Sequence, residues 1–391
     1  MRNVANKKIF IVSLCMDDWG GSEDLWARAI PYWQREGFSF VLYKESINAE
    51  HPEIKKLVEL GVALVELKNK GLKRWARRAV KLFRIAGSSF SKKKYQWDDN
   101  HLQFRKKIRT DTPRFVIIAQ AINFDGLAYA RQCMELKIPY CVIVQKAVSF
   151  YWPPSGERDF MKKVLLRAKA CYFVSQQNRD LTEEQFGIRL PNAKIVSNPI
   201  KIKREIIPYP PTENGLRLAC VARLFIIDKG QDMLLRILAM PKWKARNLHV
   251  SFIGSGTDEE GIKDMARLLE VEKVSFPGFA ENVSAVWAAH HALILPSRSE
   301  GMALSVLEAM AAGRTAIVTN AGGHKEIVQH GQTGFIAEPN EKNLDDVMEE
   351  AWQRRNEWQT IGKNAHTFIK SNITFSPEKD FSLSVMKIIN E

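Results

Sequence analysis

The chain has 391 residues, of which 45% are apolar, and this is enough to bury two cores of ordinary domain size. Its formal net charge is +14. No apolar run reaches the roughly 20 residues of a membrane-spanning helix, and the short run near the N-terminus lacks the cleavage site of a signal peptide. The 5 cysteines are scattered and form no Cys-x-x-Cys pair, which argues against a disulfide framework or a zinc site and favours a reducing, cytoplasmic compartment.

Buried-strand patterns alternate with helical patterns along the whole chain, as in doubly wound α/β domains with parallel sheets. Helical stretches such as 23–35 and 122–136 separate the strands. The strands expected in the first half are 9–14, 38–43, 63–67, 115–119, 140–144, 170–174 and 193–196. Those expected in the second half are 216–222, 249–253, 273–276, 292–295 and 315–318.

A polar, proline-rich segment over 201–215 is the best domain boundary in the chain. We therefore predict two Rossmann-like domains, over 1–200 and 201–376, and a closing helix over 377–391. Two such domains with a cleft between them bind ligands at the carboxyl ends of their strands.

A pair of glycines follows the first strand. Gly20 and Gly21 let the backbone approach an anion closely, and Ser22 can cap the helix that starts near Glu23. Taken alone, the pair is better explained as a plain turn.

A strongly basic segment lies between Lys68 and Arg109, where 15 Lys or Arg stand against 2 Asp, a net of +13 by subtraction. The stretch 71–87 is helical in period, with Trp75 and Phe83 on its apolar face. This pattern is typical of a helix on an anionic membrane surface, and equally of a solvated basic face over a core contact. A nucleic-acid role ranks lower, because no nucleic-acid-binding fold accompanies the patch.

Two cations stand at the end of the first strand of the second half. Arg223 ends that strand, and Lys229 comes six residues later, just before Gly230 and an apolar helix. Fixed cations beside a helix N-terminus neutralise a diphosphate and the charge that grows on it as a leaving group. A solvated loop with an Arg and a Lys is the alternative.

Ser299–Glu326 is the most informative stretch. Glu300 and Glu308 lie eight positions apart, with Gly301 after the first and a helical run over 303–312. A strand, a glycine turn and a helix form an anion site, because the first-turn amides lack internal partners. A phosphate is the natural occupant, with ribose hydroxyls near Glu308 and a second polyhydroxy group near Glu300. The alternative is that two glutamates stand at this spacing by chance.

The whole string, with its Gly322-Gly323 pair before Glu326, resembles the retaining glycosyltransferases of the large GT-B family often numbered four. Their signature is a glutamate, seven residues and a second glutamate, then a helix, a strand and a Gly-Gly turn. The resemblance implies a GT-B fold whose C-terminal helix crosses back onto the first domain. It also implies catalytic roles for Glu300, Arg223 and Lys229.

The resemblance further implies a set of donor-binding residues at strand ends in both domains. They are Gly20, Gly21, Ser22, Arg223, Lys229, Gly254, Gly278, Phe279, Glu300, Gly301, Met302, Ala303, Leu304, Ser305 and Glu308. Phe279 either packs against the nucleotide base or belongs to the core. Ala222 stands where most members of the family have glycine, which is a small departure.

A second departure concerns the first domain. Many members carry a His near the donor sugar, whereas this chain has none between His101 and His249. A Gln bonds sugar hydroxyls but cannot act as a base, which is compatible with front-face retaining substitution, where the departing phosphate takes the acceptor proton. The residues expected to contact the sugar or the acceptor are Asp18, Gln120, Asn123, Gln145, Lys146 and Asn198.

The expected reaction needs no metal and no cofactor. The chain has no Asp-x-Asp pair, which glycosyltransferases of the other main fold use to hold a metal ion. By family frequency the donor is UDP-glucose. The expected acceptor is a glycan or a lipid-linked oligosaccharide, reached at the cytoplasmic face of the membrane.

Two other classes stay open. A nucleotide-sugar epimerase of the same fold also pairs glutamates with a nucleotide. A non-catalytic binder of membranes or nucleic acid would use the basic segment alone.

Overall fold

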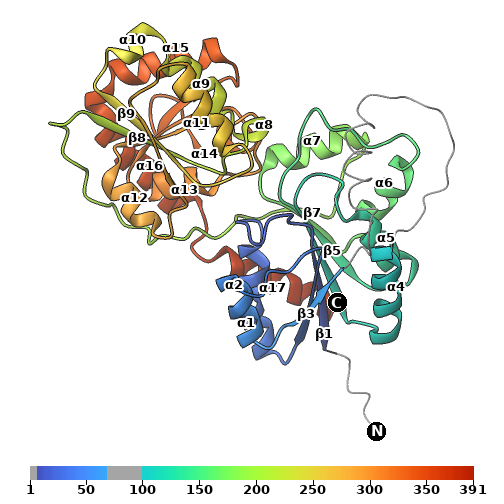
Figure 1. Ribbon diagram of the computed structural model, residues 1–391. Coiled ribbons are helices and arrows are strands. Elements are labelled where there is room, and N and C mark those ends of the chain that lie inside the picture. The colour runs from blue at the N-terminus through green and yellow to red at the C-terminus, as the bar shows by residue number, and fades with distance from the viewer. Residues whose placement is uncertain (1–6, 68–98) are drawn as a thin grey trace. The chain divides into compact units, whose positions relative to one another are not determined.

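The computed structural model describes residues 7–67 and 99–391, and these form two compact units (Figure 1). Unit 1 comprises Met1–Val174, Arg179–Val196 and Pro377–Glu391, and unit 2 comprises Ser175–Asn178 and Ser197–Ser376. The basic helix predicted over 71–87 lies outside the described residues. Within them, no helix combines the length and apolar character needed to cross a membrane.

Unit 1 is built on a seven-stranded parallel sheet in the order β3-β2-β1-β4-β5-β6-β7. Its strands are β1 (Lys8–Ser13), β2 (Ser39–Lys44), β3 (Ala63–Glu66), β4 (Phe115–Gln120), β5 (Tyr140–Val144), β6 (Ala170–Phe173) and β7 (Ala193–Ile195). The central strands are apolar except at their ends, because helices cover both faces of the sheet.

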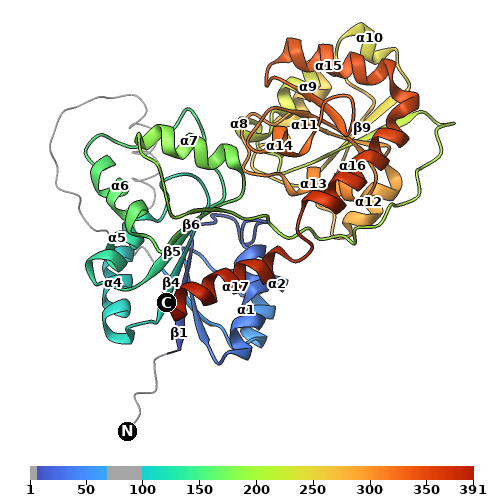
Figure 2. The same ribbon diagram turned by 180° about the vertical axis from the view of Figure 1, so that it is seen from behind.

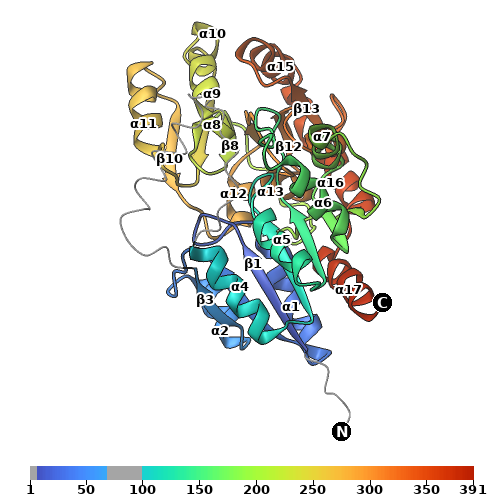
Figure 3. The ribbon, with the colours of Figure 1, turned by 90° about the vertical axis from the view of Figure 1, so that its right-hand side faces the viewer.

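The helices of unit 1 form a layer on each face of this sheet (Figures 2 and 3). One layer contains α1 (Asp24–Arg35), α2 (Pro52–Glu59) and α17 (Pro377–Asn390), and the other contains α4 (Asp99–Asp111), α5 (Leu127–Glu135), α6 (Arg158–Arg167) and most of α7 (Gln176–Phe186). The chain's last helix packs on α1, where the rings of Trp33 and Phe381 lie 5.7 Å apart and the indole N–H of Trp33 donates to the carbonyl oxygen of Ser382.

Unit 2 is built on a six-stranded parallel sheet in the order β10-β9-β8-β11-β12-β13. Its strands are β8 (Leu216–Val221), β9 (Leu248–Ile253), β10 (Val274–Gly278), β11 (Ala292–Leu295), β12 (Thr315–Thr319) and β13 (Gly334–Ala337). The sequence did not predict β13, because it is short, starts at a glycine and is flanked by polar turn residues.

Two helical layers also cover the sheet of unit 2. Its helices are α8 (Ile226–Lys229), α9 (Gln231–Leu238), α10 (Pro241–Lys244), α11 (Glu259–Leu268), α12 (Val283–Ala289), α13 (Leu304–Ala311), α14 (His324–Ile327), α15 (Glu341–Gln353) and α16 (Trp358–Asn372), with a 3-10 turn η1 (Arg355–Glu357). The helices α9, α11 and α15 pack on one face, and α12, α13 and most of α16 on the other.

Each sheet has one point where the strand order reverses, between β1 and β4 in unit 1 and between β8 and β11 in unit 2. The loops that leave the carboxyl ends of these strands diverge to opposite faces, and this is where open α/β sheets bind ligands. Many of the predicted site residues follow these strands, and others follow the neighbouring strands β5, β9 and β10.

Candidate functional site

The loop after β8 carries the two predicted cations of unit 2. Arg223 follows β8, and Lys229 ends the short helix α8. Gly230 then turns the chain with a φ of +64°, and a Cβ at this position would lie 2.2 Å from the carbonyl oxygen of Pro296. Only glycine fits where the loop after β8 passes the end of β11, and this close approach brings Lys229 to the loop that follows β11.

Lys229 and Glu300, which were expected to contact different parts of the donor, form an ion pair. The Nζ atom of Lys229 lies 2.5 Å from Oε1 of Glu300, which also accepts a hydrogen bond of 2.7 Å from the hydroxyl of Ser297. Burial works to raise the pKa of Glu300, but the ammonium of Lys229, with His324 and Ser297, outweighs it and holds that pKa below its ordinary value. Glu300 is therefore a carboxylate at neutral pH.

His324 is a buried imidazole beside this pair that the sequence analysis did not single out. Its Nδ1 lies 2.8 Å from the carbonyl oxygen of Thr319, and because a carbonyl only accepts, Nδ1 carries the proton. Its Nε2 has no hydrogen-bond partner among the residues that the structure describes. Burial lowers the pKa of His324, although the charge of Glu300 opposes this, so the ring is neutral at pH 7. The position of His324 directly after the Gly322-Gly323 turn is the feature of the sequence that could have indicated it as a site residue.

The N-terminus of α13 is open, as the sequence predicted. Ala303 is the N-cap residue and makes no side-chain cap. In the described part of the chain, no acceptor is found for the backbone N–H groups of Met302, Ala303, Leu304 or Ser305. These amides, with the positive end of the helix dipole behind them, suit an oxyanion.

A glycine pair fixes the backbone that leads into α13. A Cβ on Gly322 would lie 2.4 Å from the carbonyl oxygen of Glu300, and the N–H of Gly323 donates to the carbonyl of Gly301 at 2.8 Å. The turn after β12 thus packs directly against the loop after β11. Larger residues at Gly322 would displace the peptide that carries Glu300.

Glu308, the second glutamate of the motif, is buried on α13. Its Oε1 accepts a hydrogen bond of 3.1 Å from the backbone N–H of Lys201. The carboxylate therefore lies beside the segment that enters unit 2, one turn beyond the open amides of α13.

The ends of β9 and β10 continue this edge on the other side of β8. A Cβ on Gly254, whose φ is +142°, would lie 2.1 Å from the carbonyl oxygen of Ala222, and its N–H donates to the carbonyl of Gly278 at 2.9 Å. Phe279 is 73% exposed, so the interpretation of Phe279 as a core aromatic is wrong.

Arg223 is held more loosely than Lys229. Its side chain is 51% exposed, its Nη2 lies 3.8 Å from Oδ2 of Asp228, and its guanidinium lies over the ring of Phe225 at 5.6 Å. A guanidinium that is half exposed can be reached by an anion from solvent.

In unit 1, a buried ion pair that the sequence analysis did not predict holds the loop after β1. The Nζ atom of Lys44 lies 3.2 Å from Oε1 of Glu23 and donates to the carbonyl of Cys15 at 2.8 Å. The hydroxyl of Ser13 donates to the same carboxylate at 2.6 Å. Through these buried contacts, Glu23 and Lys44 hold the loop after β1 in place.

The predicted cap of α1 is wrong. The helix begins at Asp24, its N-cap residue is Glu23, and no side chain caps it. The carboxylate of Glu23 instead accepts a hydrogen bond from the N–H of Gly20 at 3.3 Å. The Gly20-Gly21 turn is thus stabilised by Glu23, and Ser22 does not bond the first turn.

Two of the amides expected to contact a sugar are used inside unit 1. Asn123 is buried, donates to Oε1 of Gln185 at 3.0 Å and accepts from the N–H of Val148 at 3.2 Å. Gln120 donates to the carbonyl of Asp125 at 2.5 Å. These internal hydrogen bonds differ from the sugar contacts expected for Asn123 and Gln120. A buried amide needs partners for its own donors and acceptors, and here other groups of unit 1 supply them.

The remaining first-domain candidates differ in burial, since Gln145 is buried whereas Lys146 and Asp18 are more exposed. Gln145 donates to the carbonyl of Ser22 at 3.0 Å, so the ends of β5 and β1 are joined. Lys146 follows it and is half-buried. Asp18 is exposed and accepts a hydrogen bond of 2.7 Å from Asn48. The sixth candidate, Asn198, is buried and belongs to unit 2.

The loop after β5 presents an aromatic surface that the sequence analysis overlooked. Phe150, Tyr151 and Trp152 are 67%, 41% and 59% exposed. Beneath them, the amide of Gln185 donates to the carbonyls of Val148 and Tyr151 at 2.8 and 2.9 Å. The backbone that carries the rings is therefore fixed by hydrogen bonds. In the sequence, the run Phe-Tyr-Trp before Pro-Pro could have indicated this aromatic surface.

Each unit thus gathers its own candidates at the carboxyl edge of its sheet. In unit 2 these are two cations, open helix amides and two buried carboxylates, a set suited to a diphosphate with hydroxylated groups on either side. In the described residues, no cluster of three or more His, Cys, Asp or Glu side chains is arranged to hold a metal ion.

Comparison of sequences agrees with the chemistry of this edge. Residues 202–368 match the sequence model of the family described as Glycosyl transferases group 1. A mannosylfructose-phosphate synthase of Agrobacterium fabrum is 31% identical over 310 residues, which span 67% of this chain and 67% of that protein. An uncharacterised glycosyltransferase of Haemophilus influenzae is 34% identical over 122 residues, or 31% of this chain, and the match spans only 34% of its length.

Comparison of structures extends over the whole chain. The Anabaena protein HepE, solved with UDP and glucose, matches with a TM-score of 0.72 and 16% identity over 97% of this chain and 99% of its own. Sucrose-phosphate synthase of Thermosynechococcus elongatus matches with a TM-score of 0.71 and 14% identity over 98% of both chains. At these identities the likeness concerns the fold, and it confirms the predicted GT-B class.

Proposed function

The chain belongs to the family of group 1 glycosyl transferases, and from this premise we propose that it is a retaining glycosyltransferase. It would move a hexose, with glucose as the expected one, from a UDP-sugar to a glycan or lipid-linked oligosaccharide. The proposal rests above all on the edge of unit 2, where Arg223 and Lys229 on the loop after β8 and the open amides of α13 are groups suited to a diphosphate. HepE, which has the same fold, was solved with UDP-glucose.

The charges of this edge suit departure of a nucleoside diphosphate. As the bond between the anomeric carbon and the phosphate oxygen breaks, negative charge grows on the diphosphate. The guanidinium of Arg223, the ammonium of Lys229 and the amides of α13 would stabilise that charge. The bond from the anomeric carbon to the acceptor oxygen forms on the same face, and the acceptor proton passes to the departing phosphate, so no side chain has to act as a base.

Glu300 and Glu308 would recognise the hydroxylated groups on either side of the diphosphate. Both carboxylates are buried, and the pKa of Glu300 is held low by Lys229, so Glu300 accepts hydrogen bonds from sugar hydroxyls without taking a proton. Glu308, further along α13, is proposed to accept from the ribose hydroxyls.

Calorimetric titration with UDP tests the nucleotide part of this proposal. Glu308→Ala should weaken UDP binding by about 1.5–3 kcal/mol, because it removes a charge-assisted contact. Glu270→Ala, which removes an exposed carboxylate elsewhere in unit 2, is the matched control and should bind UDP as the wild type does. Equal UDP affinity in wild type and Glu308→Ala would remove Glu308 from the site.

The proposed reaction does not depend on a divalent metal, because Arg223, Lys229 and helix amides already supply the neutralising groups. Activity should survive EDTA, and strong inhibition by EDTA would contradict this part. Mass spectrometry with a panel of nucleotide sugars identifies the donor from the glycoside formed. An epimer has the same mass as its substrate, so proton NMR of the nucleotide sugar is the parallel measurement, and an epimerised sugar in place of a glycoside would indicate an epimerase.

Attachment to the inner face of the membrane through the basic segment 68–109 is a separate proposal that rests on sequence alone. Each cation near an anionic surface contributes on the order of 1 kcal/mol, and salt weakens the attachment. Co-sedimentation with vesicles that contain anionic lipid should exceed that with neutral vesicles. Equal, negligible binding to both would leave the segment as solvated surface.

A further inference from the structure

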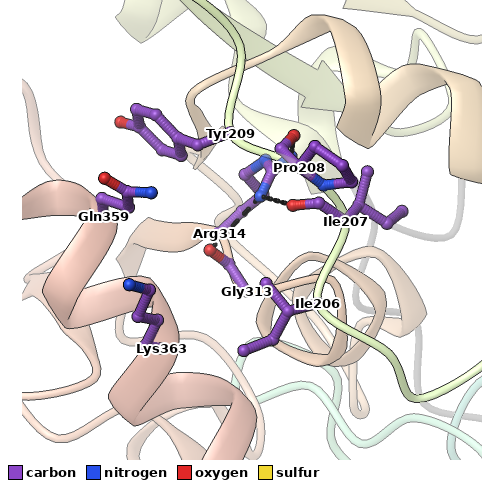
Figure 4. Close-up of a pocket in the computed structure, with 8 residues that line it drawn as sticks. All are labelled: Ile206, Ile207, Pro208, Tyr209, Gly313, Arg314, Gln359 and Lys363. Carbon is purple, nitrogen blue, oxygen red and sulfur yellow. Dashed lines mark hydrogen bonds between the residues drawn. The ribbon is translucent and has the colours of Figure 1, made fainter.

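We propose that unit 2 contains a second anion site, separate from the donor site, which binds a phosphate group as the free ion or as a monoester. The site is a pocket of about 150 Å³ (Figure 4). The segment before β8, the turn between α13 and β12, and helix α16 enclose it. Its lining residues are Ile206, Ile207, Pro208, Tyr209, Gly313, Arg314, Gln359 and Lys363.

A buried guanidinium lies at this pocket. Arg314 is fully buried, and its side chain donates only to backbone carbonyls, including those of Trp287, His290, Ile207 and Pro208 at 2.6–3.0 Å. Within the described residues no carboxylate lies in ion-pair range of it. A buried charge without a counter-ion is costly, and burial accordingly lowers the pKa of Arg314 to about 10.

One donor of this guanidinium remains unused. The Nη2 atom of Arg314 carries two N–H groups but makes a single bond within the described residues, to the carbonyl of Pro208. The guanidinium also lies over the ring of Tyr209 at 5.4 Å and has no exposed surface, so an oxyanion in the pocket would act on it by supplying the missing counter-charge close by.

Three more donors line the pocket: the hydroxyl of the half-buried Tyr209, and the ammonium of Lys363 and the amide of Gln359, both on exposed residues. Within the described residues their polar ends make no hydrogen bond, so they are open to a ligand from solvent. Figure 4 shows these three side chains together on one side of the pocket, with Arg314 and Gly313 across from them. Burial raises the pKa of Tyr209 to about 12, so its hydroxyl keeps its proton.

The positive charge of the pocket lining favours an anionic ligand. The lining contains two cations and no Asp or Glu. Donors that approach from different elements suit a tetrahedral oxyanion, and the volume holds several times the roughly 30 Å³ that one water molecule occupies. The wall is stiff, since a Cβ on Gly362 would lie 2.2 Å from the carbonyl oxygen of Gly313.

This pocket is distinct from the donor site. Gly313 and Arg314 follow the C-terminal end of α13, whereas the open amides of the donor site are at its N-terminal end. The 8 residues of α13 span about 12 Å. The second site does not depend on the proposed glycosyl transfer.

Titration calorimetry on the full chain with sodium phosphate, at constant ionic strength in a phosphate-free buffer, tests the site. Wild type should bind phosphate saturably, and Lys363→Ala should bind it about tenfold more weakly because one charge-assisted bond is lost. Lys370→Ala removes an exposed lysine on the same helix outside the pocket and should behave as wild type. Glucose 6-phosphate in parallel distinguishes the monoester from the free ion.

Comparing Arg223→Ala with Lys363→Ala locates the bound phosphate. Arg223→Ala should retain phosphate binding, and Lys363→Ala should retain the wild-type affinity for UDP. Loss of phosphate binding in Arg223→Ala would place the anion at the donor site and overturn the proposal. Equal phosphate affinity in wild type and Lys363→Ala, or no saturable binding of either phosphate compound, would overturn it as well.

Discussion

At the carboxyl edge of unit 2 the side chains are charged and the first-turn amides of α13 are open, whereas the corresponding edge of unit 1 has its polar groups bonded internally and presents aromatic rings. Lys229 and Arg223 represent the first arrangement. Asn123 and the exposed Trp152 represent the second. The two edges share a topology but differ in chemistry.

This difference follows from what each edge is proposed to bind. A nucleoside diphosphate requires fixed cations and amides whatever sugar it carries, and the family match over 202–368 falls within unit 2. An acceptor glycan offers ring faces and hydroxyls, which an aromatic surface can contact. Unit 1 is therefore expected to carry what distinguishes this chain from its relatives.

The two buried ion pairs, Lys44–Glu23 in unit 1 and Lys229–Glu300 in unit 2, give the most direct test of this difference between the two edges. Lys44→Met and Lys229→Met should each lower the free energy of unfolding by about 3–5 kcal/mol, because a buried carboxylate is left unpaired. Only Lys229→Met should lose UDP affinity. Denaturant unfolding and UDP calorimetry measure both quantities.

A control for this experiment is the double variant Lys229→Met/Glu300→Gln, which should regain much of the lost stability but not the UDP affinity. If Lys44→Met weakened UDP binding as much as Lys229→Met does, the two pairs would not differ in role.

Arg223→Ala tests whether this guanidinium stabilises the negative charge on the departing diphosphate. We expect kcat/KM to fall on the order of 10²–10³-fold, as when a preorganised stabilising group is removed. The melting temperature should hardly change, because the side chain is half exposed. Arg236→Ala, which removes an exposed, ion-paired arginine on α9, is the control and should keep its activity. Near-normal turnover in Arg223→Ala at saturating donor would exclude it from the leaving-group site.

Trp152→Ala examines the aromatic edge of unit 1. It should raise KM for the acceptor on the order of tenfold while UDP affinity stays unchanged, since a stacking contact contributes about 1.5 kcal/mol at most. Phe375→Ala removes an exposed aromatic ring from unit 2 and serves as the control. An unchanged acceptor KM would show that the aromatic surface does not contact the acceptor.

The smallest expected effect comes from His324 and depends on pH. Because burial lowers its pKa in the folded chain, the unfolded chain binds the proton first as the pH falls below about 6.5. Stability should therefore decline from pH 6.5 downwards, by up to about 1.4 kcal/mol per pH unit from this residue. His324→Asn should show a shallower decline in denaturant unfolding between pH 7 and 5. Parallel pH profiles for the two proteins would contradict this assignment.

The sequence determined the elements and the loops that carry chemistry. Every strand expected from the apolar pattern is present within two residues, because strands buried on both faces must be apolar along their length. Glycines such as Gly230 and Gly322 stand where the backbone makes close approaches. The motif around Glu300 and Glu308 shows directly in the chain, because its residues are close in sequence.

Tertiary structure alone decided how the polar side chains are paired. Lys229 and Glu300 are separated by 71 positions, and Lys44 and Glu23 by 21, so no local pattern indicates that either pair meets. Asn123 could be expected at a sugar until the fold showed Gln185 and Val148 around its amide. The physical reason is that periodicity fixes which face of an element is buried, whereas the partner of a buried polar group is fixed by which distant elements pack against that face.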